Sequence, residues 1–194
     1  MVHVPSSPAL RLAAAAGMAA AALAAGCSSS GSPGAGASPS RAAPVTMTRA
    51  APLAMKLTSS AFKENGNIPK LYTCDGQNIS VPLAWSGAPK GTAWFAVTVI
   101  DPAGPVTHWY VVDIPATTTG IKQGASYSHS MPGKQVTSWS GMCPGGGPDS
   151  YDFTVYAMPS SYKPLKTYAG YAEDEEGLAA NAIGIGYLTG YYAD

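Results

Sequence analysis

The chain has 194 residues, of which only 11% are charged, and its formal net charge is zero. This balance gives no support to a nucleic-acid-binding function, which needs a basic surface. The length suits one globular domain with an appendage, and 22 glycines and 17 prolines favour a β-rich domain with many turns.

The N-terminal residues carry the features of an export signal. Residues 9–26 form an Ala-rich apolar run just long enough to span a membrane, but its position and composition favour a signal peptide over residues 1–26. The sequence Leu23-Ala24-Ala25-Gly26-Cys27 then resembles the lipobox of bacterial lipoproteins, in which the segment before the cysteine is removed and the cysteine receives lipid. An ordinary secretory signal with an incidental cysteine is the alternative.

A segment without hydrophobic periodicity follows the lipobox. Residues 28–53 are rich in Ser, Gly, Ala and Pro, so they cannot bury a core and are typical of a flexible tether. We therefore expect a lipidated Cys27 with a tether over residues 27–53 and a globular domain over residues 54–194. The protein would then lie on the outer face of the bacterial cell membrane, or be secreted if the lipid is absent.

The other two cysteines are Cys74 and Cys143. In an exported protein they meet oxidising conditions, under which disulfides persist. Two buried free thiols are the alternative.

The remaining pattern predicts strands joined by turns, followed by one helix. Residues 92–100 and 108–114 are the best strands, and neither alternates, which indicates burial on both faces at the centre of a sandwich. The other expected elements are strands over 56–62, 79–85, 136–141 and 151–158, a surface loop over 117–134, an irregular loop over 142–149, and a helix from the acidic run 173–176 to Ile183. The glycines at 184 and 186 are expected to weaken or end this helix.

The two best strands hold two ionisable side chains at one rim of the sheet. Asp101 ends the first strand and His108 begins the second, with Pro102, Gly104 and Pro105 in the turn between them. Functional side chains are commonly held in this way, at loop ends on a rigid scaffold.

Several motifs then occur together in a characteristic order. They are F-x3-G-x-IP-x2-Y-x-CDG-x-N-x-S over 62–80, PLAW over 82–85, DPxxP and HW over 101–109, and G-x-CP with Y-x-F-x-VYAM over 141–158. In this order and spacing, residues 56–192 resemble the phosphatidylethanolamine-binding protein family, and within it the bacterial Raf kinase inhibitor-like branch.

The resemblance implies an antiparallel β-sandwich with a terminal helix and a small anion-binding pocket at one end of the sheets. Asp101 and His108 correspond to two pocket residues, and Tyr151 follows the position of a third. One wall would come from Pro102, Pro105 and Trp109, and the other from residues 141–144, including Gly141 and Cys143. The family also brings the segments of Cys74 and Cys143 to the same end, which implies a disulfide between them.

This chain departs from the family pattern inside the expected pocket. DPDAP is replaced by DPAGP, which puts Ala103 at an acidic position, and GPCPP is replaced by GMCPG, with Met142 and Gly145 for two prolines. The family's HRY is here Asp149-Ser150-Tyr151, so an aspartate replaces a pocket histidine.

The aspartate changes the ligands that the site favours. A histidine can donate a hydrogen bond to phosphate, whereas an ionised aspartate only accepts and is negative. Two unit charges about 4 Å apart interact by roughly 4 kcal/mol at an effective dielectric near 20, so the exchange could abolish phosphate binding. Asp101, His108 and Asp149 together are compatible with a cation, either an ammonium head group or a divalent metal ion held by the carboxylates and the imidazole. The alternatives are that Asp149 faces solvent and that Asp101 and His108 only pin the turn.

Three classes of function remain open. We favour a binding module without catalysis or cofactor, which holds a small anionic or phospholipid-head-group-like ligand. An enzyme with His108 as base and Cys143 or a serine as nucleophile is less favoured, because no G-x-S-x-G nucleophile elbow is present. A kinase or protease inhibitor that uses the loop over 117–134 is the other alternative.

The lipobox generates the first testable prediction. We expect the Cys27→Ala chain to stay uncut or to be released, whereas the wild-type protein partitions into the detergent phase because its cysteine carries lipid. A wild-type protein that is soluble and begins within residues 28–45 would contradict lipidation. The domain should be exported in either case.

Overall fold

The structure is a computed structural model that describes residues 50–104, 106–127, 130–163 and 171–193. The predicted signal peptide and nearly all of the predicted tether lie outside these residues. In the described part of the chain, no helix is long and apolar enough to cross a membrane.

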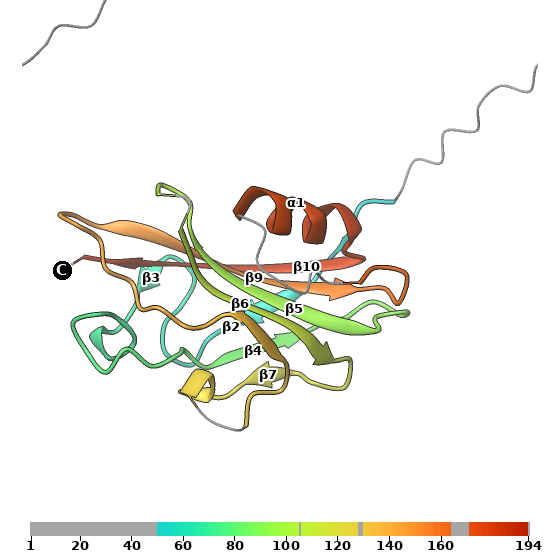
Figure 1. The fold of residues 1–194 in the computed structure, drawn as a ribbon, viewed down its shortest axis with the longest axis horizontal. Helices are drawn as coiled ribbons and strands as arrows, with labels where there is room; N and C mark the ends of the chain where they lie inside the picture. The colour runs from blue at the N-terminus through green and yellow to red at the C-terminus, as the bar shows by residue number, and fades with distance from the viewer. Residues whose placement is uncertain (1–49, 105, 128–129, 164–170, 194) are drawn as a thin grey trace, which may run out of the picture. The chain divides into compact units, whose positions relative to one another are not determined.

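The domain is a β-sandwich with one helix on its outer side (Figure 1). The larger sheet has the order β1-β10-β9-β5-β6-β8, with β3 also paired to β10, and the smaller sheet has the order β2-β4-β7. Among the described residues the elements are β1 (Leu53–Ala54), β2 (Lys56–Thr58), β3 (Gly66–Asn67), η1 (Lys70–Tyr72), β4 (Leu83–Ser86), β5 (Trp94–Asp101), β6 (Val106–Pro115), β7 (Gly120–Ile121), η2 (Ala125–Tyr127), β8 (Lys134–Thr137), β9 (Asp149–Met158), α1 (Tyr171–Asn181) and β10 (Gly184–Tyr192). The mainly β, predominantly antiparallel sandwich is confirmed.

The centre of the larger sheet agrees closely with the sequence prediction. Strand β5 pairs antiparallel with β6 on one side and with β9 on the other, and every residue of β5 except Asp101 is buried. One apolar core fills the space between the two sheets, and a second lies between the larger sheet and α1. Burial on both faces explains why β5 and β6 show no alternation of polar and apolar residues.

The last strand, β10, was not predicted. Glycines weaken strand propensity, and we expected Gly184 and Gly186 to weaken or end the helix rather than to begin a strand. In the structure the glycines of β10 allow other segments to pack close to the strand. A Cβ added at Gly186 would lie 3.0 Å from the backbone oxygen of Met55. One added at Gly190 would lie 2.7 Å from side-chain atoms of Phe62 and Ile68. The N-terminal segments therefore pack directly on β10.

Smaller differences concern the ends of elements. The first strand of the smaller sheet stops at Thr58 rather than at residue 62, and the loop over 117–134 contains β7 and η2. Leu53, assigned to the tether by composition, already pairs with β10 in β1. The predicted weak strand over 136–141 is β8, shifted toward the N-terminus.

The helix buries one carboxyl group against the outer face of the larger sheet. Leu178 of α1 and Ala182, the residue after its end, pack on this face, and one turn before Leu178 the Glu175 carboxyl group accepts a hydrogen bond from the Tyr156 hydroxyl. Burial raises the pKa of Glu175 to about 7, and the nearby carboxylate of Asp152 acts in the same direction. The fold therefore favours the protonated form of Glu175.

This burial makes stability depend on pH. The stabilising contribution of protonated Glu175 is fully present below the ordinary pKa of 4.5 and is lost as pH rises through about 7. The change is of order 3 kcal/mol, since one pKa unit corresponds to about 1.4 kcal/mol. Glu175→Gln keeps an acceptor for Tyr156 without the charge, so we expect it to raise the melting temperature at pH 8 and to leave it nearly unchanged at pH 4.5. Equal effects at both pH values, measured by thermal denaturation, would contradict this prediction.

Candidate functional site

Asp101 organises the turn between β5 and β6. Its Oδ1 accepts hydrogen bonds from the backbone N–H groups of Ala103 at 2.8 Å and Gly104 at 3.1 Å. The carboxylate is half-buried, and Pro102 beside it is exposed. The predicted wall residue Pro105 lies outside the described residues. Asp101 thus holds the turn through the backbone, in the way that aspartates commonly stabilise turns.

A β-bulge determines where His108 points. Val99 of β5 pairs with Trp109 of β6, but the next residue, Ile100, pairs with Thr107, so His108 is the extra residue between them. Bulges of this kind redirect side chains at the rims of sheets. The bulge explains why consecutive residues, His108 and Trp109, both contact the core between the two sheets.

The imidazole of His108 is fixed in orientation. Its Nδ1 lies 2.8 Å from the backbone oxygen of Ser140, and its ring meets Tyr151 edge-on with centroids 5.3 Å apart. Because a carbonyl oxygen only accepts, Nδ1 carries the proton and donates. In the neutral ring Nε2 is then a hydrogen-bond acceptor, and it becomes a donor only when the ring is protonated.

The segment after Ser140 forms the wall beside His108. The N–H of Gly141 donates to Asn78 Oδ1 at 2.7 Å, and a Cβ at Gly141 would lie 2.6 Å from that same oxygen. Met142, which replaces a family proline, is fully buried in the core. Cys143 is exposed and forms the expected disulfide with Cys74. The wall is therefore tied to the loop over 73–78 by both covalent and hydrogen bonds.

Trp109 supports the site from behind. It is fully buried, it donates from Nε1 to Gln135 Oε1 at 2.8 Å, and it packs edge-on against Trp139. That Trp109 contacts a ligand stays a prediction.

Asp149 is the first residue of β9. It lies two residues before Tyr151, so strand alternation puts both side chains on the same face, about 7 Å apart along the strand. The Asp149 side chain is half-buried, and within the described part of the chain no hydrogen bond or ion pair involves its carboxylate. It therefore stays available to a ligand.

Two polar residues at this end of the sandwich, Tyr192 and Asp75, were not predicted from the sequence. Tyr192 of β10 is registered directly opposite Asp149, and its hydroxyl donates to Asp75 Oδ2 at 2.5 Å. Asp75 follows Cys74 and belongs to the CDG motif, which was the only available signal for it. Tyr192 could not be found, because β10 itself was not predicted.

The site residues thus gather at one end of the sandwich without forming a direct Asp101–His108 pair. No hydrogen bond or ion pair joins these two side chains in the described structure. A groove between β2 and β10 lies away from these residues, and a smaller cavity of about 240 Å³ at the margin of the site is lined partly by Tyr192. No cluster of His, Cys, Asp and Glu among the described residues could hold a metal ion.

The architecture and this cluster define a β-sandwich protein with a polar site at one end of its sheets. Residues 58–193 match the model of the family described as phosphatidylethanolamine-binding protein. The chain belongs to this family, which confirms the resemblance found in the sequence.

Relatives span archaea and bacteria. The UPF0098 protein of Methanothermobacter thermautotrophicus is 32% identical over 149 residues, which cover 71% of this chain and 98% of that protein. LppC of Mycobacterium tuberculosis, whose name contains the word lipoprotein, is 34% identical over 160 residues, covering 76% of this chain and 78% of that protein.

Two solved structures share the fold. Escherichia coli YbcL, described as a member of the mammalian PEBP family, superposes with a TM-score of 0.64 at 32% identity and covers 72% of this chain and 98% of its own. The PEBP homologue CT736 of Chlamydia trachomatis gives a TM-score of 0.62 at 25% identity, covering 73% and 98%.

The disulfide at the site generates a stability prediction. It links residues 69 positions apart, and closing a loop of this size stabilises a fold by about 4 kcal/mol in the chain-entropy model. We expect the unreduced, denatured Cys27→Ala chain to show no thiol that reacts with a labelling reagent. We also expect reduction to lower the denaturation midpoint sharply. Two labelled thiols before reduction would contradict the bond.

Proposed function

We propose that this protein is a non-catalytic binding module, held at the outer face of the membrane by Cys27, for a small head group that carries a protonated amine beside a phosphate. Phosphoethanolamine is the simplest such ligand. Membership of the family supports binding as the general activity. The amine preference comes from the side chains of this particular chain.

One observation carries the preference. Nδ1 of His108 already donates to Ser140, so neutral His108 presents an acceptor at Nε2, and Asp149 adds a half-buried carboxylate that only accepts. Two acceptors on one side of a site match an ammonium group, which has donors only. They do not match a bare phosphate, since its charge would face that of Asp149.

Two further observations support the remaining parts of the proposal. The name of the LppC relative agrees with a tethered lipoprotein in the cell envelope. Cys143 is bonded to Cys74 and therefore supplies no thiolate nucleophile, which weakens the alternative of a cysteine hydrolase.

Calorimetric titration tests the ligand class. We expect wild-type protein to bind phosphoethanolamine at least tenfold more tightly than inorganic phosphate, a difference of about 1.4 kcal/mol. Asp149→His removes a negative charge and adds a donor, so it should strengthen phosphate binding and weaken phosphoethanolamine binding. His108→Ala should weaken phosphoethanolamine binding without unfolding the domain.

Asp113→His is a matched control. It makes the same substitution at another aspartate, which is exposed and far along β6 from the site. It should leave both affinities unchanged. Equal phosphate binding by wild-type and Asp149→His proteins would mean that Asp149 does not face the ligand, and tight phosphate binding by the wild type would overturn the proposed amine preference.

A further inference from the structure

A groove lies at the edge of the larger sheet, apart from the residues of the candidate site. Its volume is about 670 Å³, within the range of small-ligand sites. It is lined by residues 54–59, which run from the end of β1 to just beyond β2, by Phe62, Lys63 and Glu64, and by Tyr187 and Leu188 of β10.

The groove exists because the chain leaves the edge of β10 and later returns to it. Up to Met55 the chain pairs with β10, and the Met55 N–H donates to the Ile185 oxygen at 2.8 Å. The chain then crosses to the smaller sheet as β2 and returns at Asn65, whose N–H donates to the Thr189 oxygen at 2.8 Å. The edge is uncovered between these points, over about 13 Å of strand.

One residue of β10 presents its backbone to this gap. The carbonyls of Ile185 and Thr189 point to the outer edge, so alternation directs the N–H and C=O of Tyr187, midway between them, to the same edge. No residue of β1 or β3 is registered with Tyr187, and no described residue outside the sheet pairing bonds its backbone. An extended ligand could therefore donate to its C=O and accept from its N–H.

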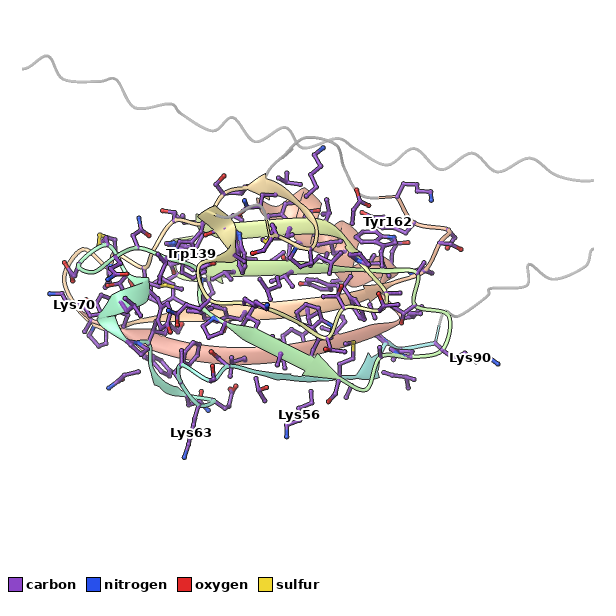
Figure 2. The ribbon with its side chains drawn as sticks, turned by 90° about the horizontal axis from the view of Figure 1, so that it is seen from below. Lys56, Lys63, Lys70, Lys90, Trp139 and Tyr162 are labelled. Carbon is purple, nitrogen blue, oxygen red and sulfur yellow. A yellow bond between two sulfur atoms is a disulfide. The ribbon has the colours of Figure 1, made fainter. Side chains whose placement is uncertain are left out.

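The walls supply apolar contact and positive charge. The side chains of Leu57, Phe62 and Leu188 are buried beside the groove. Lys56 and Lys63 line it, and both extend from the same side of the domain in Figure 2. The single carboxylate, that of Glu64, already accepts from the Thr189 N–H at 3.0 Å. The groove is thus positive overall.

We propose that this groove binds a short acidic peptide in an extended conformation, which completes the sheet edge by pairing with Tyr187. Addition of a strand to an exposed edge is a recurring mode of peptide recognition, in which main-chain hydrogen bonds give affinity and flanking side chains give specificity. About three ligand residues fill the gap between Ile185 and Thr189, and their carboxylates lie near the two lysines.

Charge argues for a peptide from another molecule rather than from this chain. Residues 28–49, which precede the described part, contain Arg41 and Arg49 and no acidic residue. The two lysines of the groove would repel such a segment, whereas they attract an acidic one.

Fluorescence polarisation with a fluorescein-labelled Val-Glu-Val-Glu-Val peptide tests the proposal on the full-length protein. We expect Lys56→Glu/Lys63→Glu to weaken binding at least fivefold. The matched control Lys70→Glu/Lys90→Glu reverses two exposed lysines that lie toward the opposite ends of the domain in Figure 2, and it should change affinity less than twofold. No binding by the wild type, or equal losses in both double variants, would overturn the proposal.

Backbone pairing has its own test. β1 and β3, on either side of the gap, both pair parallel with β10, so we expect the peptide to run parallel as well. In such a pair the N–H groups of successive peptide residues point alternately toward and away from β10. Peptides N-methylated singly at successive positions should therefore alternate between weakened and unchanged binding. Affinity that is insensitive to N-methylation at every position would show attraction by charge alone and would overturn strand addition.

Discussion

The close approach of the N-terminal segments to β10 is the constraint on which the rest of the structure depends. Gly186 and Gly190 present no side chain toward the core, so Met55, Phe62 and Ile68 pack directly against the strand. This contact joins the two sheets along one side of the sandwich. A larger side chain at either position would meet atoms at 3.0 Å or less and would force the layers apart.

Both proposed binding regions follow from this contact. At the C-terminal end of β10, Tyr192 lies opposite Asp149 and donates to Asp75, which places β10 beside the candidate head-group site. At its middle, the crossing of the chain from β1 to β2 leaves Tyr187 uncovered. One strand therefore contributes to two chemically different sites, one with a surplus of acceptors and the other with a surplus of cations.

The head-group site also shows how a family scaffold can change its ligand preference without changing its fold. The disulfide, the bond from Gly141 to Asn78 and the bulge at His108 fix the geometry of the wall and the imidazole. The charge at Asp149 is independent of these features, because the side chain makes no structural hydrogen bond in the described part of the chain. A residue that carries no structural role can be exchanged at little cost in stability, and its exchange alters mainly the electrostatics of binding.

The sequence by itself determined the features that depend on local composition or on whole motifs. Uninterrupted apolar runs identified β5 and β6 as central strands, and ordered motifs identified the family and its Cys74–Cys143 bond. Only the tertiary structure decided the role of the glycines in β10, the bulge that turns His108 toward Tyr151, and the gap at Tyr187. These features arise from contacts between residues far apart in the chain. The propensity of a glycine or the position of a histidine is local, whereas the neighbour that packs against it is set by the fold.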